Sequence, residues 1–410
     1  MISEQQFIDE AQEFLDANAA RRSETKRVWG EGSDEVAIFT EHTPEQDRAE
    51  VGAAKAWRAK VYDAGFGWIT GPERWGGREL PAAYEKAYRA LEAKYDTPSQ
   101  GAFGIGLGMI APTIQSHATE EAKDRYLPAM YRGDIVACQL FSEPGAGSDL
   151  AGLQSRAIRD GDEWIITGQK VWTSGAQYSD IGEIICRTDP DLPKHKGLTG
   201  FIVDMKAPGV EVRPLRQMTG GASFNEVFFT EVRVPDDHRL GDVNQGWTVA
   251  LTTLMNERAA IGGAGLGIEG GGTGALMNEM LRQTGANRDP LLRQKAAELY
   301  ANTQVARYTT QRALAKMAAG QLPGPELSIA KLALTNNLSR ISQLVASALG
   351  ARMTADTGEW GTFSWAGFVL GVPGMRVAGG TDEVMKNIIG ERVLGLQKEP
   401  KPQESPKVDL

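Results

Sequence analysis

The hydrophobic period of the chain changes twice along its length, and this change limits the possible folds more than any other feature. Apolar residues recur at helical spacing through residues 3–132 and again from about residue 246 to about residue 396. Between these segments, short runs rich in β-branched and aromatic residues alternate with turn signals, as in residues 160–167 and 226–234. Helices, then strands, then helices predict an α+β protein in three parts.

The chain of 410 residues exceeds what one hydrophobic core usually organises. The strand-rich runs are short and regularly interrupted, which favours a small antiparallel barrel or sandwich of roughly 100 residues. We place an N-terminal α-helical domain at 1–133, a central β-barrel domain at 134–240 and a C-terminal four-helix-bundle domain at 241–397. The polar, proline-containing tail, residues 398–410, is expected to be disordered.

The composition favours an acidic soluble enzyme. A formal net charge of −9 argues against nucleic acid or an anionic membrane surface as the main partner. The N-terminus has no basic segment followed by an apolar one, and no apolar run approaches the length of a membrane span, so we expect a cytoplasmic protein. Cys138 and Cys186 lie in apolar, strand-like surroundings and are expected to be core residues in a reducing compartment.

Two stretches carry most of the functional information. Residues 139–149 pack glycines, a proline and small polar residues between apolar flanks, so that backbone N–H groups can approach a ligand closely. Residues 168–174 offer one large aromatic face, Trp172, beside two hydroxyl groups. A planar, hydrogen-bonding cofactor such as a flavin needs both kinds of surface. Taken alone, Trp172 is also consistent with an ordinary core position in a barrel.

The two stretches together resemble the acyl-CoA dehydrogenase family. Four further segments match in the family's order and spacing: residues 126–128, 256–258, 379–383 and 387–392. The resemblance covers about residues 3–397. The resemblance implies an N-terminal helical domain, a central β-barrel domain and a C-terminal helical bundle. It also implies FAD as the cofactor.

Carried over residue by residue, the resemblance gives each matched position a role. Ser142 would lie at the pyrimidine edge of the flavin, Trp172 would cover one face, and Ser174 would hydrogen-bond near N5. The positions implied for the cofactor are Gln139, Phe141, Ser142, Gly147, Ser148, Trp172, Thr173, Ser174, Arg282, Thr381 and Glu383. Those implied for the substrate are Ser148, Asn256, Arg258, Gly379 and Gly380.

The chain departs from the commonest family pattern at the catalytic base. Many members carry a glutamate before Gly-Thr in the C-terminal loop, where this chain has Gly379. A bacterial subset places its glutamate on the helix after the β-domain, and Glu257 matches that position. The alternative is a surface carboxylate paired with Arg258 or another cation. Pairing with Arg258 is disfavoured because adjacent helix residues point in different directions.

A second departure concerns the flavin diphosphate. The family usually has an Arg-x-x-Phe-Gly signature that reaches the diphosphate in a neighbouring subunit, and the corresponding segment, 282–286, lacks the phenylalanine. Arg282 is therefore open to two interpretations, a diphosphate ligand or a solvated arginine near a helix end.

The sequence thus predicts an FAD-dependent acyl-CoA dehydrogenase that forms a trans-2-enoyl thioester and passes electrons to an electron-transfer flavoprotein. We expect a homotetramer or a heterotetramer with a related subunit, and no metal site, since the four histidines are scattered. Two alternatives stay open: a non-catalytic partner subunit of a hetero-oligomer, and an oxidase of the same fold. Straight-chain, branched-chain and steroid acyl groups all remain candidates.

Overall fold

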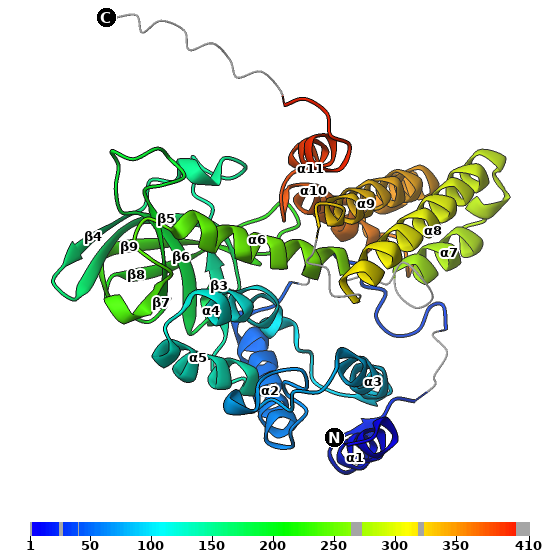
Figure 1. The fold of residues 1–410 in the computed structure, drawn as a ribbon. Coiled ribbons are helices and arrows are strands. Elements are labelled where there is room, and N and C mark those ends of the chain that lie inside the picture. The colour runs from blue at the N-terminus through cyan, green and yellow to red at the C-terminus, as the bar shows by residue number, and fades with distance from the viewer. Residues whose placement is uncertain (1, 24–27, 40, 264–272, 319–323, 399–410) are drawn as a thin grey trace, which may run out of the picture. The chain divides into compact units, whose positions relative to one another are not determined.

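The structure, a computed structural model, describes residues 2–23, 28–39, 41–263, 273–318 and 324–398, with the backbone alone at 258–263, 314 and 316–318. Its contacts divide the chain into two compact units, Met1–Ala260 and Ile261–Leu410 (Figure 1). The predicted tail lies almost wholly outside the described residues.

The first third of the chain is helical, as predicted. Ser3 and Thr43 each form a capping box, which satisfies the first backbone N–H groups of the helix that follows. The helices are α1 (Glu4–Asn18), α2 (Pro44–Asp63), α3 (Ala82–Glu92), α4 (Ala111–His117) and α5 (Glu120–Arg132). A short two-stranded sheet, β1 (Ala20–Arg21) with β2 (Tyr95–Asp96), joins distant parts of this region.

The centre of the chain is an eight-stranded sheet. Its strands are β3 (Ala137–Leu140), β4 (Arg156–Asp160), β5 (Glu163–Ser174), β6 (Ile181–Arg187), β7 (Leu198–Asp204), β8 (Val210–Leu215), β9 (Phe224–Pro235) and β10 (Arg239–Leu240). The order is β10-β7-β6-β4-β5-β9-β8, and β3 pairs in parallel with β6. Most of the predicted strand runs lie within these elements.

The helix α6 (Gly246–Gly263) follows the sheet and belongs to the first unit up to Ala260. Val249 and Ala250 on its first turns are fully buried in one apolar cluster with Ile185 and Ile202 of the sheet. This packing fixes the start of α6 against β6 and β7.

The second unit is a helical bundle. Its helices are α7 (Thr273–Gln283), α8 (Pro290–Ala318), α9 (Leu327–Leu349), α10 (Trp365–Val377) and α11 (Asp382–Ile388). Helices α8, α10 and α11 all contact α9, whose buried residues include Leu338, Ile341 and Val345. Gly350 follows α9 with a positive φ, a conformation that favours glycine where a helix ends.

The predicted α+β architecture is confirmed, with helices, sheet and helices in chain order. The residue boundaries of the three domains remain a prediction. No helix in the described part of the chain is both long and apolar enough to cross a membrane.

Candidate active site

The two informative stretches are adjacent in space. Residues after β3 form a tight turn in which Glu143 and Ala146 exchange backbone hydrogen bonds. The N–H of Val171 donates to the carbonyl of Ser142 at 2.8 Å, which joins this turn to β5. The structure therefore places the turn beside the strand that carries Trp172.

A buried ion pair holds the turn in place. Lys170 is fully buried and its Nζ donates to Glu143 Oε1 at 2.9 Å, to the carbonyl of Phe141 at 3.1 Å and to the carbonyl of Ile185 at 2.9 Å. Glu143 also accepts two backbone N–H bonds from residues 154 and 155. Burial alone would raise the pKa of Glu143, but the charge and hydrogen bond of Lys170 outweigh it and hold the pKa below its usual value.

Gly145 and Gly147 leave the backbone of this turn without side chains. A Cβ added at Gly145 or Gly147 would meet nothing within 4 Å, and neither residue has a positive φ. No described part of the chain therefore requires glycine at these positions. Bare, exposed backbone of this kind suits the close approach of a flat or phosphate-bearing ligand.

Trp172 is held in a strained backbone conformation. Its φ is 62°, which is rare for a bulky residue, and it lies at a register shift between β5 and β9. The side chain is 59% exposed, and its ring meets Phe224 edge-on, with centroids 6.0 Å apart. The alternative that Trp172 is a core residue is thus excluded. Strain at an exposed aromatic residue points to a functional position.

The residues after Trp172 add polar groups. Thr173 is buried, and its Oγ1 has no hydrogen-bond partner among the described residues. Its carbonyl accepts from Asn225 Nδ2 at 3.1 Å, while Ser174 is half-buried. An orphaned hydroxyl beside an exposed aromatic ring fits a site that a polar, planar cofactor completes.

The other positions implied for the flavin in this unit differ in exposure. Gln139 and Ser142 are half-buried, and Gly147 and Ser148 are exposed. The ring of Phe141 is buried in the apolar core between the sheet and the helices.

The matched glutamate lies on α6. Glu257 is half-buried, and Asn256 donates from Nδ2 to the carbonyl of Thr252 at 3.0 Å. The side chain of Arg258 lies outside the described residues. The substrate-binding role predicted for Arg258 therefore stays a prediction.

A second carboxylic acid, Glu183, was missed by sequence reasoning. It lies on β6, is 1% exposed, and accepts a hydrogen bond from Thr253 at 2.7 Å. Burial raises its pKa to about 8, and the charge of Glu257 adds to the rise while Thr253 opposes it. A lone acidic residue within the apolar run 181–186 was the available signal.

In the second unit, a buried network supports the Gly379 loop. Lys331 is 1% exposed and donates to the carbonyl of Gly380 at 2.6 Å. It lies 3.6 Å from Asp382, which accepts from Arg376 at 2.7 Å. Gly379 and Gly380 both have positive φ values, 67° and 94°, so a side chain at either position is strained.

The neighbouring candidates also have defined surroundings. Thr381 is the N-cap of α11 and accepts from the N–H of Val384, and Glu383 is exposed in the first turn. Arg282 lines a cavity of about 190 Å³ together with Arg293, Asn278 and Asn287. Two guanidinium groups and two amides suit an anion, although Arg282 also donates to Glu279 at 3.0 Å.

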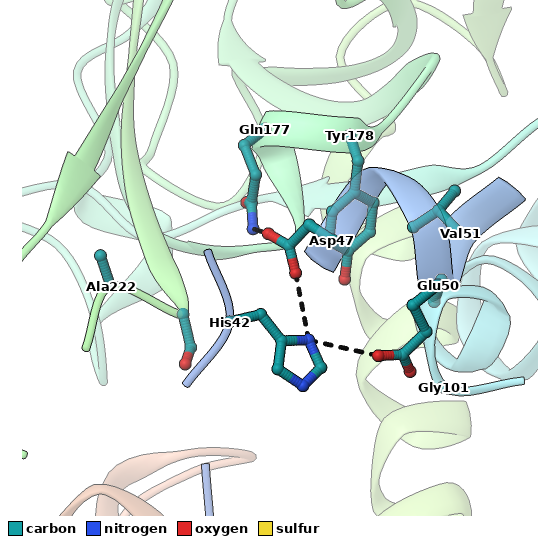
Figure 2. Close-up of a pocket in the computed structure, with 10 residues that line it drawn as sticks. His42, Asp47, Glu50, Val51, Gly101, Gln177, Tyr178 and Ala222 are labelled. Atoms are coloured by element: carbon teal, nitrogen blue, oxygen red, sulfur yellow. Dashed lines mark hydrogen bonds and ion pairs between the residues drawn. The ribbon is translucent and has the colours of Figure 1, made fainter. Parts of the chain in front are cut away.

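A larger cavity of about 240 Å³ lies elsewhere in the first unit. Figure 2 shows His42 between Asp47 and Glu50, with its Nδ1 at 3.3 Å and 3.2 Å from their carboxylates. None of the sequence candidates lines this cavity. Two carboxylates in its wall would repel a phosphate, so it does not suit the anionic parts of FAD or CoA. Among the described residues, no cluster that could hold a metal ion is present.

Comparison with known proteins agrees with the geometry. The chain matches the acyl-CoA dehydrogenase N-terminal domain over residues 3–134, the middle domain over residues 138–232 and the C-terminal domain over residues 244–394.

Two curated mycobacterial proteins and one solved structure are similar to the chain. Acyl-CoA dehydrogenase FadE34 of Mycobacterium tuberculosis is 40% identical over 70% of this chain, which spans only 39% of FadE34. Acyl-CoA dehydrogenase IpdE1 of the same organism is 36% identical, covering 85% of this chain and 89% of IpdE1. The solved Tcur3481-Tcur3483 steroid ACAD is 25% identical with a TM-score of 0.73, covering 97% of this chain and 98% of that one. The three domain matches and the IpdE1 similarity together establish that the chain belongs to the acyl-CoA dehydrogenase family.

Proposed function

We propose that this protein oxidises an acyl-CoA thioester to the trans-2-enoyl-CoA, with FAD as cofactor and Glu257 as the catalytic base. The observation that carries the proposal is the surface formed by Trp172 and the bare turn at Gly145 and Gly147. This surface lies in the same compact unit as the α6 turn that carries Glu257.

The residues of the first unit would bind the flavin. Trp172 would cover one face of the ring system with its exposed side chain. Thr173 and Ser174 would offer hydroxyl groups to the ring edge, and Ser142 would offer a hydroxyl at the pyrimidine end. The exposed backbone through Gly147 and Ser148 would lie against the phosphate-bearing part of the ligands.

The second unit would contribute further contacts. Thr381 and Glu383 at the start of α11 would bind the cofactor, as the family resemblance implies. Arg282 would bind the flavin diphosphate, for which the cavity shared with Arg293 provides suitable donors.

Glu257 would act as general base. Its carboxylate would take the α-proton of the thioester, and the electron pair of that C–H bond would form the new double bond as a hydride leaves the β-carbon. FAD supplies the acceptor for that hydride when it is bound. Backbone N–H groups of Gly379 and Gly380 would polarise the thioester carbonyl, and Asn256 and Arg258 would bind the substrate.

The positive φ of Gly379 supports a base outside this loop. A glutamate at this position would adopt a left-handed backbone conformation, which costs about 1 kcal/mol or more for a residue with a side chain. The loop is instead shaped for glycine and held by Lys331.

The test is product analysis with purified protein. We expect a panel of straight-chain, branched-chain and steroid-side-chain CoA thioesters to yield, for at least one member, a product two hydrogens lighter. Turnover that requires an electron-transfer flavoprotein supports the dehydrogenase. Turnover with oxygen consumption and no other acceptor would indicate the oxidase instead.

The name of the steroid ACAD joins two chains, Tcur3481 and Tcur3483. We therefore include a heterotetramer beside the homotetramer in our proposal. Co-expression with a related subunit distinguishes them: a chain that binds FAD and turns over alone supports the homo-oligomer. A chain that is inactive alone and active with its partner supports the hetero-oligomer.

A further inference from the structure

A carboxylic acid, Glu183, lies in the apolar layer between the sheet and α6. Glu183 is 1% exposed, and its strand neighbours on the same face, Ile181 and Ile185, are buried in the core cluster that also contains Val249 of α6. An ionised carboxylate in such surroundings is strongly disfavoured. A buried acid retained in an apolar layer requires a specific explanation.

A chain of hydrogen bonds joins Glu183 to two helices. Thr253 of α6 donates to Glu183 Oε1 at 2.7 Å, and its hydroxyl lies 2.9 Å from that of Thr113. The single hydroxyl proton of Thr113 is shared between Thr253 Oγ1 and the carbonyl of Met109, which lies 2.9 Å from Thr113 Oγ1. Glu183 Oε2 is buried and accepts no hydrogen bond from the residues that the structure describes. One satisfied and one orphaned oxygen favour the neutral, protonated form.

The position of Glu183 connects it to the proposed base. Thr253 and Glu257 are four residues apart on α6, so they are neighbours along one side of the helix. Across the parallel β3–β6 pair, Glu183 lies directly opposite Gln139, one of the residues proposed for the flavin. Glu183 thus sits between a strand of the flavin site and the helix turn of the base.

We propose that Glu183 is a second acid of the active site, a positioning residue whose charge acts on Glu257 and whose hydrogen bond with Thr253 holds the α6 turn. The role assigned to Glu257 rests on the proposed function. In its neutral form, Glu183 holds the α6 turn through Thr253 without repelling the base. When Glu183 ionises, its negative charge raises the proton affinity of Glu257 and makes Glu257 a stronger base.

The surrounding charges are consistent with this coupling. Among the side chains that the structure describes, Glu257 is the charged group that acts on Glu183, and it raises the pKa of Glu183 beyond the effect of burial. From α4, His117 contacts the hydroxyl of Thr252 at 2.8 Å, and burial lowers the pKa of this histidine, so it is neutral near neutral pH. From β3, the facing residue is the uncharged Gln139.

The first experiment is independent of turnover. The infrared band of a protonated carboxyl group is followed against pH in wild type, Glu183→Gln and Glu257→Gln holoprotein. We expect a band that disappears near pH 8 in wild type, is absent in Glu183→Gln, and disappears at lower pH in Glu257→Gln. A Glu183 titration that Glu257→Gln leaves unmoved overturns the coupling.

The second experiment measures the rate of anaerobic flavin reduction by an acyl-CoA against pH. Wild type is expected to show an increase of about threefold to tenfold as Glu183 ionises, since a negative charge that interacts with Glu257 strengthens the base. The isosteric Glu183→Gln should lose this inflection. If the inflection persists in Glu183→Gln, the proposal is wrong.

A matched pair of variants separates coupling from packing. Thr253→Val keeps the side-chain shape but removes the donor that lowers the pKa of Glu183, so the inflection should move to higher pH. Thr253→Ser keeps the hydroxyl and should leave it in place. Equal profiles for the two variants would refute the role of Thr253. Failure of every thioester to reduce the flavin would reject the proposed function, while the infrared titration would still decide the coupling.

Discussion

Replacing Lys170 by methionine should destabilise the first unit strongly and loosen the turn after β3. The side chain is fully buried, and its Nζ makes three hydrogen bonds, one of them to Glu143. Without the ammonium group, the Glu143 carboxylate stays buried with two backbone donors and only the weaker Coulombic attraction of Arg187. Breaking a buried ion pair in this way costs about 3 to 5 kcal/mol.

Thermal unfolding of the first unit should show the loss. At about 3 °C per kcal/mol for a unit of this size, the Tm of Lys170→Met should fall by about 10 °C. The amount of FAD retained after purification should fall as well, because residues 141–148 lose their anchor. The double variant Lys170→Met with Glu143→Gln should recover much of the Tm, since no buried charge is then left unpaired.

The control is an ion pair of the same chemistry at the surface. Lys194 lies 2.8 Å from Asp149, with half or more of each side chain exposed. Lys194→Met should change the stability by less than about 1 kcal/mol. A Tm loss for Lys170→Met no greater than that for Lys194→Met would refute the reasoning.

Three further predictions follow from single residues. The folded pKa of Glu183, about 8, lies above its ordinary value of 4.5, so the folded state keeps a proton that the unfolded state releases. The free energy of unfolding of wild type should therefore fall between about pH 5 and pH 8, by on the order of 3 to 5 kcal/mol more than that of Glu183→Gln. Urea unfolding at each pH measures this difference. Trp172→Gly should relieve a backbone strain of about 1 kcal/mol and raise the Tm of the FAD-free protein while weakening FAD binding, measured by calorimetry and flavin titration; unchanged FAD affinity would contradict the proposed role. Lys331→Met should lower the Tm of the second unit, because the buried Asp382 carboxylate loses one of its neighbouring positive charges. Lys331→Arg keeps the charge but not the shape of lysine, so its Tm should lie between those of Lys331→Met and wild type.

The fold was largely predictable because its signals are local. The helical spacing of apolar residues within 3–132 predicted buried helix faces, and in α1 that face consists of Phe7, Ala11 and Leu15. The strands were predictable from their alternation with turn signals. These features depend on residues close together in the sequence, where period and propensity act.

The site was predictable only in part. The candidates on the turn and on β5 came from motifs, and the structure joins them through Ser142 and Val171. The pairing of Lys170 with Glu143 and of Glu183 with Thr253 depends on strand register and helix packing across long sequence separations. No period in the sequence encodes such contacts, although a charged residue within an apolar strand is a signal that one exists.

The most direct test of the account is anaerobic reduction of the bound flavin by acyl-CoA in wild type and in Glu257→Gln. The account predicts that an acyl-CoA bleaches the flavin absorbance of wild type, and that Glu257→Gln retains the flavin but loses the bleaching. Bleaching of equal rate in the two proteins would show that Glu257 is not the base. Protein purified without any flavin, and unable to bind it when FAD is added, would contradict the proposed cofactor site.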